Sequence, residues 1–346
     1  MTVLLDARVL RLGHRVELPV RRRSLVLGLV LALLILCTAT ATLTLGRLGI
    51  PLDQLPAALF GGAQGKTAFV LGHLRGPRLL VALGAGAALG IAGALFQSVT
   101  RNPLGSPDVI GVSAGAGAGA ACCALLLPAA IPVSLGAVLG AAAAVGLVAI
   151  STGTGLANPM RLVLAGIGVS AMAIAFTQYV VYVVARDRAT VLSAYINGSL
   201  NARGWDHVAT IWILLALCVV PLIMITVPLG LTEMGDEVSS SLGVSAATVR
   251  RRAVLLSVVL AGGAVAVAGP IAFIALTAPH ITRRLARSAR PLLGLSAVTG
   301  ALLLALSDLA IQQVPLFDGL PVGILTLAIG GAYLGVLLVA EWRKSW

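Results

Sequence analysis

The chain has 346 residues, of which 59% are hydrophobic and only 10% are charged, and its mean hydropathy is +1.04. A soluble domain needs a far more charged surface, so the composition excludes one and indicates a protein with several membrane spans. The net charge of +12 could indicate nucleic-acid binding, but the 24 Lys and Arg residues lie at the ends of apolar runs rather than in one basic stripe.

The apolar runs predict membrane-spanning helices. Most stretches without Asp, Glu, Lys or Arg exceed the ~20 residues that cross a bilayer as a helix. They lack the period-two alternation of membrane β-strands. The first run follows Arg21, Arg22 and Arg23 and resembles a signal peptide, but it is too long for one. We therefore interpret 24–45 as a retained first span and 1–23 as a basic cytoplasmic tail.

Two long runs each predict a pair of helices. Residues 109–160 are long enough for two spans, and Pro128 with Pro132 marks the turn between them. The thirty residues of 253–282 have basic clusters at both ends, and one crossing would place one cluster on the wrong side of the membrane. Two crossings are needed, with the break at Gly269-Pro270 and at least one short helix.

The sequence thus predicts an all-α integral membrane protein, a single polytopic domain over residues 1–346, with both termini cytoplasmic. In this topology 17 of the Lys and Arg residues are inside and 7 are outside, as the positive-inside rule requires. The ten predicted spans are 24–45, 79–100, 109–127, 133–152, 162–185, 208–229, 252–269, 271–282, 291–310 and 321–340.

Glycine and alanine are abundant and predict close helix packing. The chain has 40 glycines, and the run GAGAGA follows Ser113. Small residues on one face of a membrane helix let a neighbouring helix approach closely. The run is not followed by GKS or GKT, so it does not indicate a phosphate-binding loop.

The sequence lacks the residues that several other mechanisms require. The acidic residues fall in loops or at span ends, and Asp308 is the deepest of them, so a buried proton relay is not predicted. No Walker motif, catalytic triad or metal-ligand spacing occurs. We expect a chain that is not an enzyme and binds no metal or cofactor, and any ATP drive must come from another subunit.

Several ordered motifs resemble one family. The segment RGPRLLVALGAGAALGIAGALFQSVTRNPLGSPDVIGVSAGAGAGA at 75–120 is similar to the FecCD-type permease subunits of ATP-binding-cassette (ABC) importers for iron–siderophore complexes, haem and cobalamin. The pattern continues through RLVLAGIGVS, MGDEVSSSLGVSAATVRRR, AGPIAFIALTAPHITRR, GALLLALSD and LPVGILTLAIGG. The resemblance covers nearly all of the chain after about residue 70.

The resemblance implies an architecture and a set of partners. The fold would be the ten-helix type II ABC-importer permease, with a short eighth helix. The chain would pair with a second permease subunit, two ATPase subunits that hold ATP and Mg, and an extracytoplasmic substrate-binding protein. The localisation would be the bacterial cytoplasmic (inner) membrane.

The resemblance also assigns roles to residues near the ends of the spans. Arg75 and Arg78, which we place just before the second span, would dock acidic residues of the binding protein; the alternative is interfacial snorkelling. Asn102, Pro103 and Leu104 would form a cytoplasmic gate; the alternative is an ordinary loop.

Residues 232–249, between spans six and seven, would form the loop that couples to the ATPase. The motif positions in it are Gly235, Asp236, Glu237, Leu242 and Gly243. Pro279, His280 and Arg283 follow a structural motif at the end of the short eighth span. One histidine at a helix end is more often structural than a proton carrier.

Two departures bear on the partner and the cargo. Gln312 stands where the family usually has an arginine, and Gly319 replaces a glutamate, with Asp318 one place earlier. We therefore expect the second permease subunit to be non-identical. A ferric siderophore is the expected cargo, with haem or cobalamin as alternatives, and an ion-coupled secondary transporter and a nucleic-acid-binding membrane protein rank lower.

Overall fold

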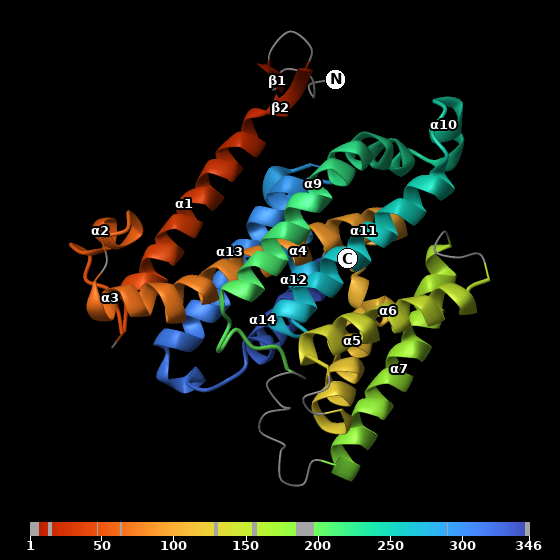
Figure 1. The fold of residues 1–346 in the computed structure, drawn as a ribbon. Helices are drawn as coiled ribbons and strands as arrows, with labels where there is room; N and C mark the ends of the chain where they lie inside the picture. Colours follow the sequence, from red (N-terminus) through yellow and green to blue (C-terminus); the bar gives the residue numbers. More distant parts are fainter. Residues whose placement is uncertain are drawn as a thin grey trace.

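The computed structural model describes residues 7–12, 16–46, 48–62, 64–127, 131–153, 158–184, 197–288 and 290–342. The fold is mainly helical (Figure 1). Its longer helices are α1 (Arg22–Thr44), α4 (Gly76–Thr100), α5 (Val112–Ala121), α6 (Val133–Ser151), α7 (Pro159–Val184), α9 (Trp205–Glu233), α11 (Ala246–Ala268), α12 (Ile274–Ala286), α13 (Leu293–Gln313) and α14 (Val322–Trp342). The shorter elements are β1 (Ala7–Leu12), β2 (Val16–Arg21), α2 (Leu55–Leu59), α3 (Gly65–Phe69), α10 (Asp236–Ser241), two 3-10 turns (Pro107–Ile110 and Pro315–Phe317) and two π-helical segments (Val70–Arg75 and Cys122–Leu126).

Helices occur at the positions of the predicted spans, although several of them differ from those spans in length. Within the described residues, seven helices are long and apolar enough to cross a membrane, and 112–126 and 322–337 form shorter apolar helices. Each of the ten predicted spans overlaps a helix, including the short α12. The protein is therefore an all-helical membrane protein apart from its N-terminal strands, and the number of crossings stays a prediction.

Helix α4 lies at the centre of the bundle. Its most apolar window is 83% buried, against 17% for α1, and it packs against α9, α11, α12 and α13. Glycines allow this packing, because a methyl group built on Gly93 would lie only 1.6 Å from the carbonyl oxygen of Ala275 in α12. A methyl group on Gly90 would likewise lie 2.1 Å from the oxygen of Ser296 in α13. Small residues thus set how closely α12 and α13 approach α4.

The GAGAGA run forms a close contact between α5 and α6, as predicted. A methyl group built on Gly119 would lie 2.0 Å from the oxygen of Gly136, and one on Gly115 would lie 2.5 Å from the oxygen of Gly140. Gly115 and Gly119 in α5, and Gly136 and Gly140 in α6, have the i, i+4 spacing that places residues on one helix face. Gly117 lies off this face, with no atom within 4 Å of a built methyl group. The alternation therefore provides one contact face rather than a uniformly small helix.

The predicted break at Gly269-Pro270 separates α11 from α12. Gly269 has a φ of +74° and Phe273 lies in the left-handed region at +66°. The neighbouring chain satisfies part of the irregular backbone, because Ser199 N donates to Ala268 O at 2.8 Å. Non-helical backbone at membrane depth requires such internal partners. Helix α12 begins at Ile274, three residues later than predicted, and continues to Ala286.

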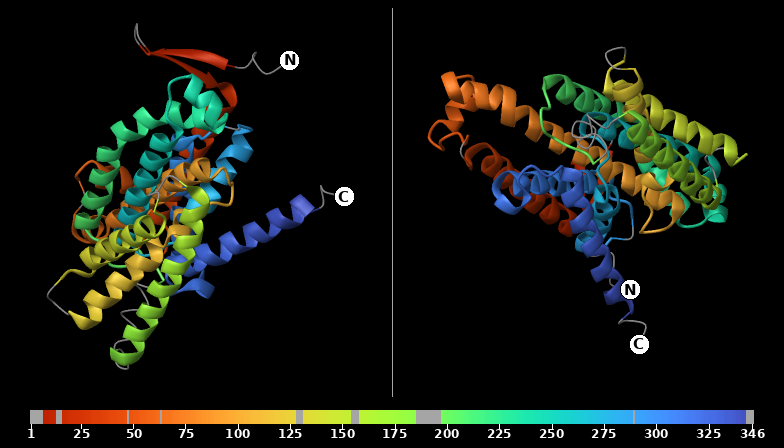
Figure 2. Two further views of the ribbon diagram at one scale, coloured as in Figure 1. Left: turned by 90° about the vertical axis from the view of Figure 1, so that its right-hand side faces the viewer. Right: turned by 90° about the horizontal axis from the view of Figure 1, so that it is seen from below.

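The structure adds a hairpin at the N-terminal end of the chain, whereas α14 agrees with the last predicted span, 321–340. The predicted N-terminal tail contains an antiparallel hairpin of β1 and β2, in which Ala7 pairs with Arg21 and Leu12 with Val16. Helix α14 extends away from the bundle, as the two views of Figure 2 show. The cytoplasmic position of both termini therefore stays a prediction.

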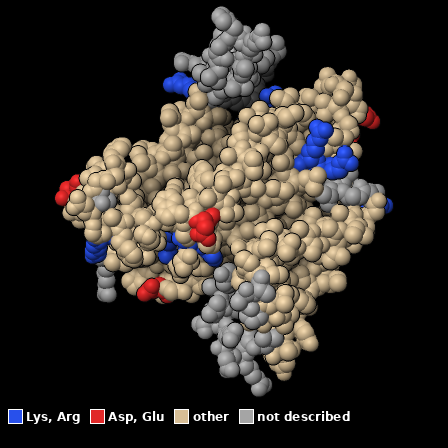
Figure 3. Space-filling view, in the orientation of Figure 1, with Lys and Arg blue, Asp and Glu red and all other residues tan. Residues whose placement is uncertain are grey.

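Uncharged side chains cover most of the surface in the view of Figure 3, with Lys, Arg, Asp and Glu in small separate groups. Large apolar side chains are exposed along α9, including Ile223, Met224 and Val227. An apolar surface of this extent is typical of helices that contact lipid or other membrane subunits.

Candidate functional site

The predicted gate residues form a tight turn after α4. Arg101 ends the helix in the left-handed conformation with a φ of 48°. The side-chain oxygen of Asn102 accepts a hydrogen bond from Leu104 N at 2.9 Å, and its carbonyl accepts one from Gly105 N at 3.0 Å. Pro103 has no N–H with which to continue a helix. The turn is present as predicted, its residues are exposed, and their role as a gate stays a prediction.

The predicted coupling segment contains the short helix α10 between two glycines. Gly235 has a φ of +120° and Gly243 a φ of +77°, conformations that side-chain-bearing residues rarely adopt. Asp236 and Glu237 begin α10, and Leu242 follows it with 58% of its surface exposed. Because α9 runs to residue 233 and α11 starts at 246, the connection is shorter than the predicted 232–249. Figure 1 shows α10 at the edge of the bundle.

One carboxylate joins this segment to the gate turn and to α11. The Arg101 guanidinium donates to Asp236 Oδ1 and to Thr232 O, both at 2.7 Å, and Arg250 donates to the same Asp236 oxygen. The hydrogen bond from Arg250 is the main cause that holds the pKa of Asp236 below its ordinary value, with the charge of Arg250 and the Arg101 bond adding to it. Movement of α10 would therefore act directly on the residue before the Asn-Pro-Leu turn.

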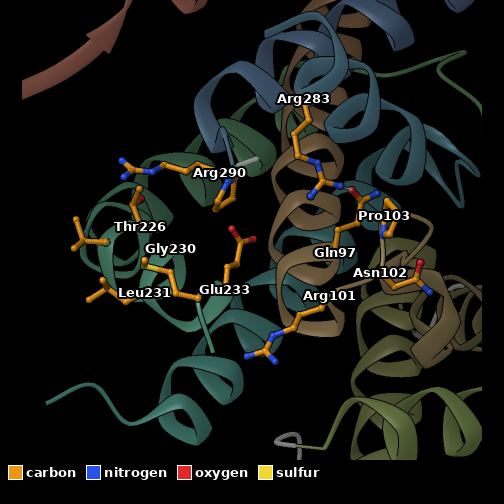
Figure 4. Close-up of a pocket in the computed structure, with 13 residues that line it drawn as sticks. Gln97, Arg101, Asn102, Pro103, Thr226, Gly230, Leu231, Glu233, Arg283 and Arg290 are labelled. Carbon is orange, nitrogen blue, oxygen red and sulfur yellow. Dashed lines mark hydrogen bonds between the residues drawn. The ribbon is translucent and has the colours of Figure 1, made fainter. Parts of the chain in front are cut away.

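A cavity of about 690 Å³ lies beside this network, between the ends of α4 and α9 and the connection after α12. Arg101, Arg283, Arg290 and Glu233 line it, and Figure 4 shows Glu233 pointing into the space between α9 and α4. Arg283 donates to the side-chain oxygen of Gln97. Arg283, assigned by resemblance to a structural motif, thus links α12 to the end of α4.

At the opposite end of α4, Arg78 forms a buried ion pair. Its Nε and Nη2 donate to Asp308 of α13 at 2.7–3.0 Å, and its Nη1 donates to Asn201 Oδ1 at 2.6 Å. Asp308 is 2% exposed and Arg78 is 19% exposed. Gln312, which replaces the family's usual arginine, donates to the second Asp308 oxygen at 2.7 Å. The deepest acid is thus paired internally, and Arg78 joins α4 to α13.

Arg75 occupies a different environment from Arg78. Its guanidinium donates to Thr42 O of α1 at 2.6 Å, and it lines a depression of about 760 Å³ together with Arg78, Arg203 and Asp318. Arg75 directly precedes α4 and Arg78 lies in its first turn, so their position before the second span stays a prediction. Both lie in a helical stretch that begins at Gly65 and passes through the π-helical segment into α4. Their charges ended the apolar run without ending the helix.

A second cavity, of about 710 Å³, lies between α5, α7, the break before α12 and the start of α14. Its apolar wall includes Ile174, Val181 and Leu327. Its polar residues are Asp108, Ser113, Ser170, Thr177, Gln178 and Asn197. Asp108 accepts hydrogen bonds from Ser106 and Ser113, so both of its carboxyl oxygens have partners within the 3-10 turn and the start of α5. The cavity is therefore mainly apolar with a polar strip.

Pro279 and His280 lie within α12 rather than at its end. The imidazole Nδ1 of His280 lies 2.7 Å from the Tyr333 hydroxyl of α14, and the two rings meet edge to face. This contact fits the structural role expected for the motif. Within the described ranges, no group of three or more His, Cys, Asp or Glu residues is placed to hold a metal ion.

The partners of the charged residues could not be found from the single sequence. Asp236 pairs with Arg101, 135 residues earlier, and Arg78 pairs with Asp308, 230 residues later. The sequence marked Asp236 as a motif position of the predicted coupling loop and Asp308 as the deepest acid, without a partner for either. No local pattern relates such distant charges.

Comparisons with known proteins agree with these features. Residues 30–340 match the FecCD transport family. The chain is 38% identical to the ferric enterobactin transport system permease protein FepG of Escherichia coli, over 94% of this chain and 99% of FepG. It is 36% identical to the Fe(3+)-citrate import system permease protein YfmE of Bacillus subtilis, over 94% of this chain and 98% of YfmE. It is 33% identical to the hemin transport system permease protein HmuU of Yersinia pestis, over 78% of this chain and 83% of HmuU.

A solved structure supports the same assignment. An ABC transporter described as of metal-chelate type, in an inward-facing conformation, superposes with a TM-score of 0.79 at 25% identity, over 91% of this chain and 99% of that one. ATP hydrolysis by such transporters lies in a separate subunit, so this chain is not an enzyme. The chain belongs to the FecCD transport family and is the membrane permease subunit of an ABC transporter.

Proposed function

We propose that this permease carries a ferric siderophore inward across the cytoplasmic membrane of a bacterium, driven by two ATPase subunits. The observation that carries the mechanism is the contact of Asp236 with both Arg101 and Arg250. It connects α10, the segment proposed to dock on the ATPase, to the turn proposed as the gate. The names of FepG and YfmE, which specify ferric enterobactin and Fe(3+)-citrate, support an iron chelate as the cargo.

The proposed coupling step is a rigid movement of α10. The exposed side chains of Leu242 and Glu237 could contact a groove on an ATPase subunit, the first by apolar packing and the second by its charge. Closure of the ATPase on nucleotide would displace α10, and Asp236 would transmit that displacement to Arg101. The Asn102–Leu104 turn follows Arg101 directly, so its position would change with the nucleotide state.

The proposed path is the mainly apolar cavity between α5, α7 and α14. A bulky chelate needs a wide surface with few strong contacts, because a tight site would hold the cargo instead of releasing it. We propose that a second permease subunit completes this path. Gln312 and Gly319, which depart from the family pattern, favour a non-identical partner with its own docking residues.

An ion-driven mechanism has less support. Asp308, the deepest acid, has its charge balanced by Arg78 and a further hydrogen bond from Gln312. A proton relay needs an acid that is free to exchange its proton with successive partners, and both oxygens of Asp308 are already engaged within the protein.

We further propose ten crossings with both termini in the cytoplasm. This topology places the α10 segment inside the cell and the Arg75 depression outside. There an extracytoplasmic substrate-binding protein would dock on Arg75 and the rest of the basic rim, which we define as the arginines that line the depression, Arg75, Arg78 and Arg203. Arg78 would contribute mainly by holding the rim in place, since its guanidinium is already paired with Asp308.

The cargo is tested by uptake into proteoliposomes that contain this chain, its ATPase and the second permease subunit. Labelled ferric siderophore, haem and cobalamin are compared, each with its binding protein and with ATP inside. The proposal expects ATP-dependent uptake of the siderophore that persists with an ionophore. Uptake of haem alone, the cargo in the name of HmuU, or of cobalamin alone would keep the mechanism and refute the substrate.

A further inference from the structure

The cavity beside the coupling segment has an excess of positive charge that the transport mechanism does not use. The cavity has a volume of about 690 Å³, and three arginines and one glutamate line it. Arg101 and Arg283 are already engaged, with Asp236 and Gln97 respectively. Glu233 lies within electrostatic range of both. The remaining cation, Arg290, makes no side-chain hydrogen bond or ion pair with any residue that the structure describes.

Arg290 is placed to bind an anion away from Glu233. Figure 4 shows its side chain extending toward Thr226 of α9, on the far side of the cavity from Arg283. A guanidinium presents several donors in one plane, a geometry that matches the oxygens of a phosphate. A carboxylate facing the same point would oppose binding, but Glu233 lies nearer Arg101 and Arg283 in this view.

The opposite wall of the cavity is the surface of a membrane helix. Val227, Gly230 and Leu231 of α9 line it, and Val227 is 71% exposed. The exposed apolar face continues from there to Ile223 and Met224, one turn deeper in the predicted span. The cavity thus has arginines on one side and the apolar surface of α9 on the other, at the predicted membrane surface. Basic pockets between membrane helices on the cytoplasmic side are typical sites for anionic lipid head groups.

We propose that this cavity binds a phosphate-bearing anion, supplied by an anionic phospholipid of the inner leaflet. Arg290 contacts the phosphate, and the acyl chains lie on the exposed face of α9. The bound lipid holds the end of α9 near the connection after α12, next to the Asp236 network. This proposal depends on the membrane position of α9 and not on the identity of the transported chelate.

Two variants test the site in different ways. Arg290→Gln removes the free cation. Gly230→Leu fills the cavity and keeps every charge, because a methyl group built on Gly230 meets no atom within 4 Å. The matched controls are Arg287→Gln, an exposed arginine that does not line the cavity, and Gly146→Leu, a glycine of α6 that is equally open.

Retention of phosphatidylglycerol by the purified full-length chain is measured by native mass spectrometry, with phosphatidylcholine as the zwitterionic comparison. We expect Arg290→Gln to weaken phosphatidylglycerol binding about fivefold, since one arginine near an anionic lipid contributes about 1 kcal/mol. Gly230→Leu should weaken it at least as much, and both controls should bind like the unmodified chain. Equal melting temperatures in phosphatidylcholine confirm that the variants are folded.

A second arm distinguishes a lipid from free phosphate. Inorganic phosphate is titrated against the protein in phosphatidylcholine nanodiscs, and binding is followed by calorimetry. Lipid retention that phosphate does not displace assigns the lipid as the source. Phosphate binding that Arg290→Gln abolishes assigns the free anion and keeps the site. If neither probe distinguishes Arg290→Gln and Gly230→Leu from their controls, the proposal is wrong.

Discussion

The ion pair between Arg78 and Asp308 should be the largest single electrostatic contribution to the contact of α4 with α13. Arg78→Met would leave a carboxylate that is 2% exposed without its cation. Breaking a buried pair from one side destabilises proteins by about 3–5 kcal/mol. Gln312 still donates to Asp308, so we expect the lower end, about 3 kcal/mol.

The double variant distinguishes a true pair from two independent residues. Asp308→Leu alone should lower the free energy of unfolding by about 1–2 kcal/mol, because Arg78 keeps its bond to Asn201 and some solvent access. Arg78→Met combined with Asp308→Leu should be little worse than Asp308→Leu, since replacing a buried pair by apolar residues is often near neutral. The coupling free energy is then about 2–3 kcal/mol.

The assay is reversible unfolding in mixed micelles, with helix content followed by circular dichroism. Lys66→Met is the matched control, because Lys66 is exposed, and its effect should stay within about 0.5 kcal/mol. If the two single effects add to the double effect within about 0.5 kcal/mol, the pair does not form as described and the reasoning is refuted.

Three further predictions concern the contact of α5 with α6, the docking of the binding protein at Arg75, and the contacts of Asp236. Gly119→Ala should destabilise the chain by about 1–3 kcal/mol in the same unfolding assay, because the added methyl group would meet Gly136 O at 2.0 Å; Gly117→Ala has open space and should be neutral or slightly stabilising. Arg75→Gln should slow association of the binding protein and reduce its salt dependence in stopped-flow measurements, with equilibrium affinity changing less. Arg250 lowers the pKa of Asp236, so the ionised carboxylate stabilises the fold above the ordinary aspartate pKa of about 3.9. This stabilisation is lost as the pH falls through the lower pKa of the folded state. The stability advantage over Asp236→Asn should therefore be constant from pH 5 to 8 and decline below about pH 4.

Apolar runs and turn residues were sufficient to place the helices. Charge-free stretches located most helix ends within a few residues, although α11 begins at Ala246, six residues before its predicted span, and Gly269-Pro270 correctly marked the break before α12. The Asn-Pro pair at 102–103 predicted a turn because proline cannot continue a helix. The small residues after Ser113 predicted a close helix contact, and the structure assigns that contact to Gly115 and Gly119.

Other features depend on contacts that a single sequence does not encode locally. The helical stretch that contains Arg75 extends to Gly65 although its charges interrupt the apolar pattern, and Arg75 itself is held by the carbonyl oxygen of Thr42 in α1. The hairpin at 7–21 lies in a basic stretch that we interpreted only as a tail. Asp236 meets Arg101 and Arg250, and Asp308 meets Arg78, only through the packing of α4, α11 and α13, so the sequence identified some of these residues without relating them to one another.

The proposed role of Asp236, to transmit ATPase movement to the gate turn, can be tested by the ratio of substrate uptake to ATP hydrolysis. ATP hydrolysis and substrate uptake are measured in parallel in the reconstituted transporter with Asp236→Asn, using Glu237→Gln, an exposed neighbour on α10, as the control. The account predicts that Asp236→Asn retains ATP hydrolysis while uptake per ATP falls severalfold, and that Glu237→Gln preserves the ratio. An unchanged uptake per ATP in Asp236→Asn would contradict the account.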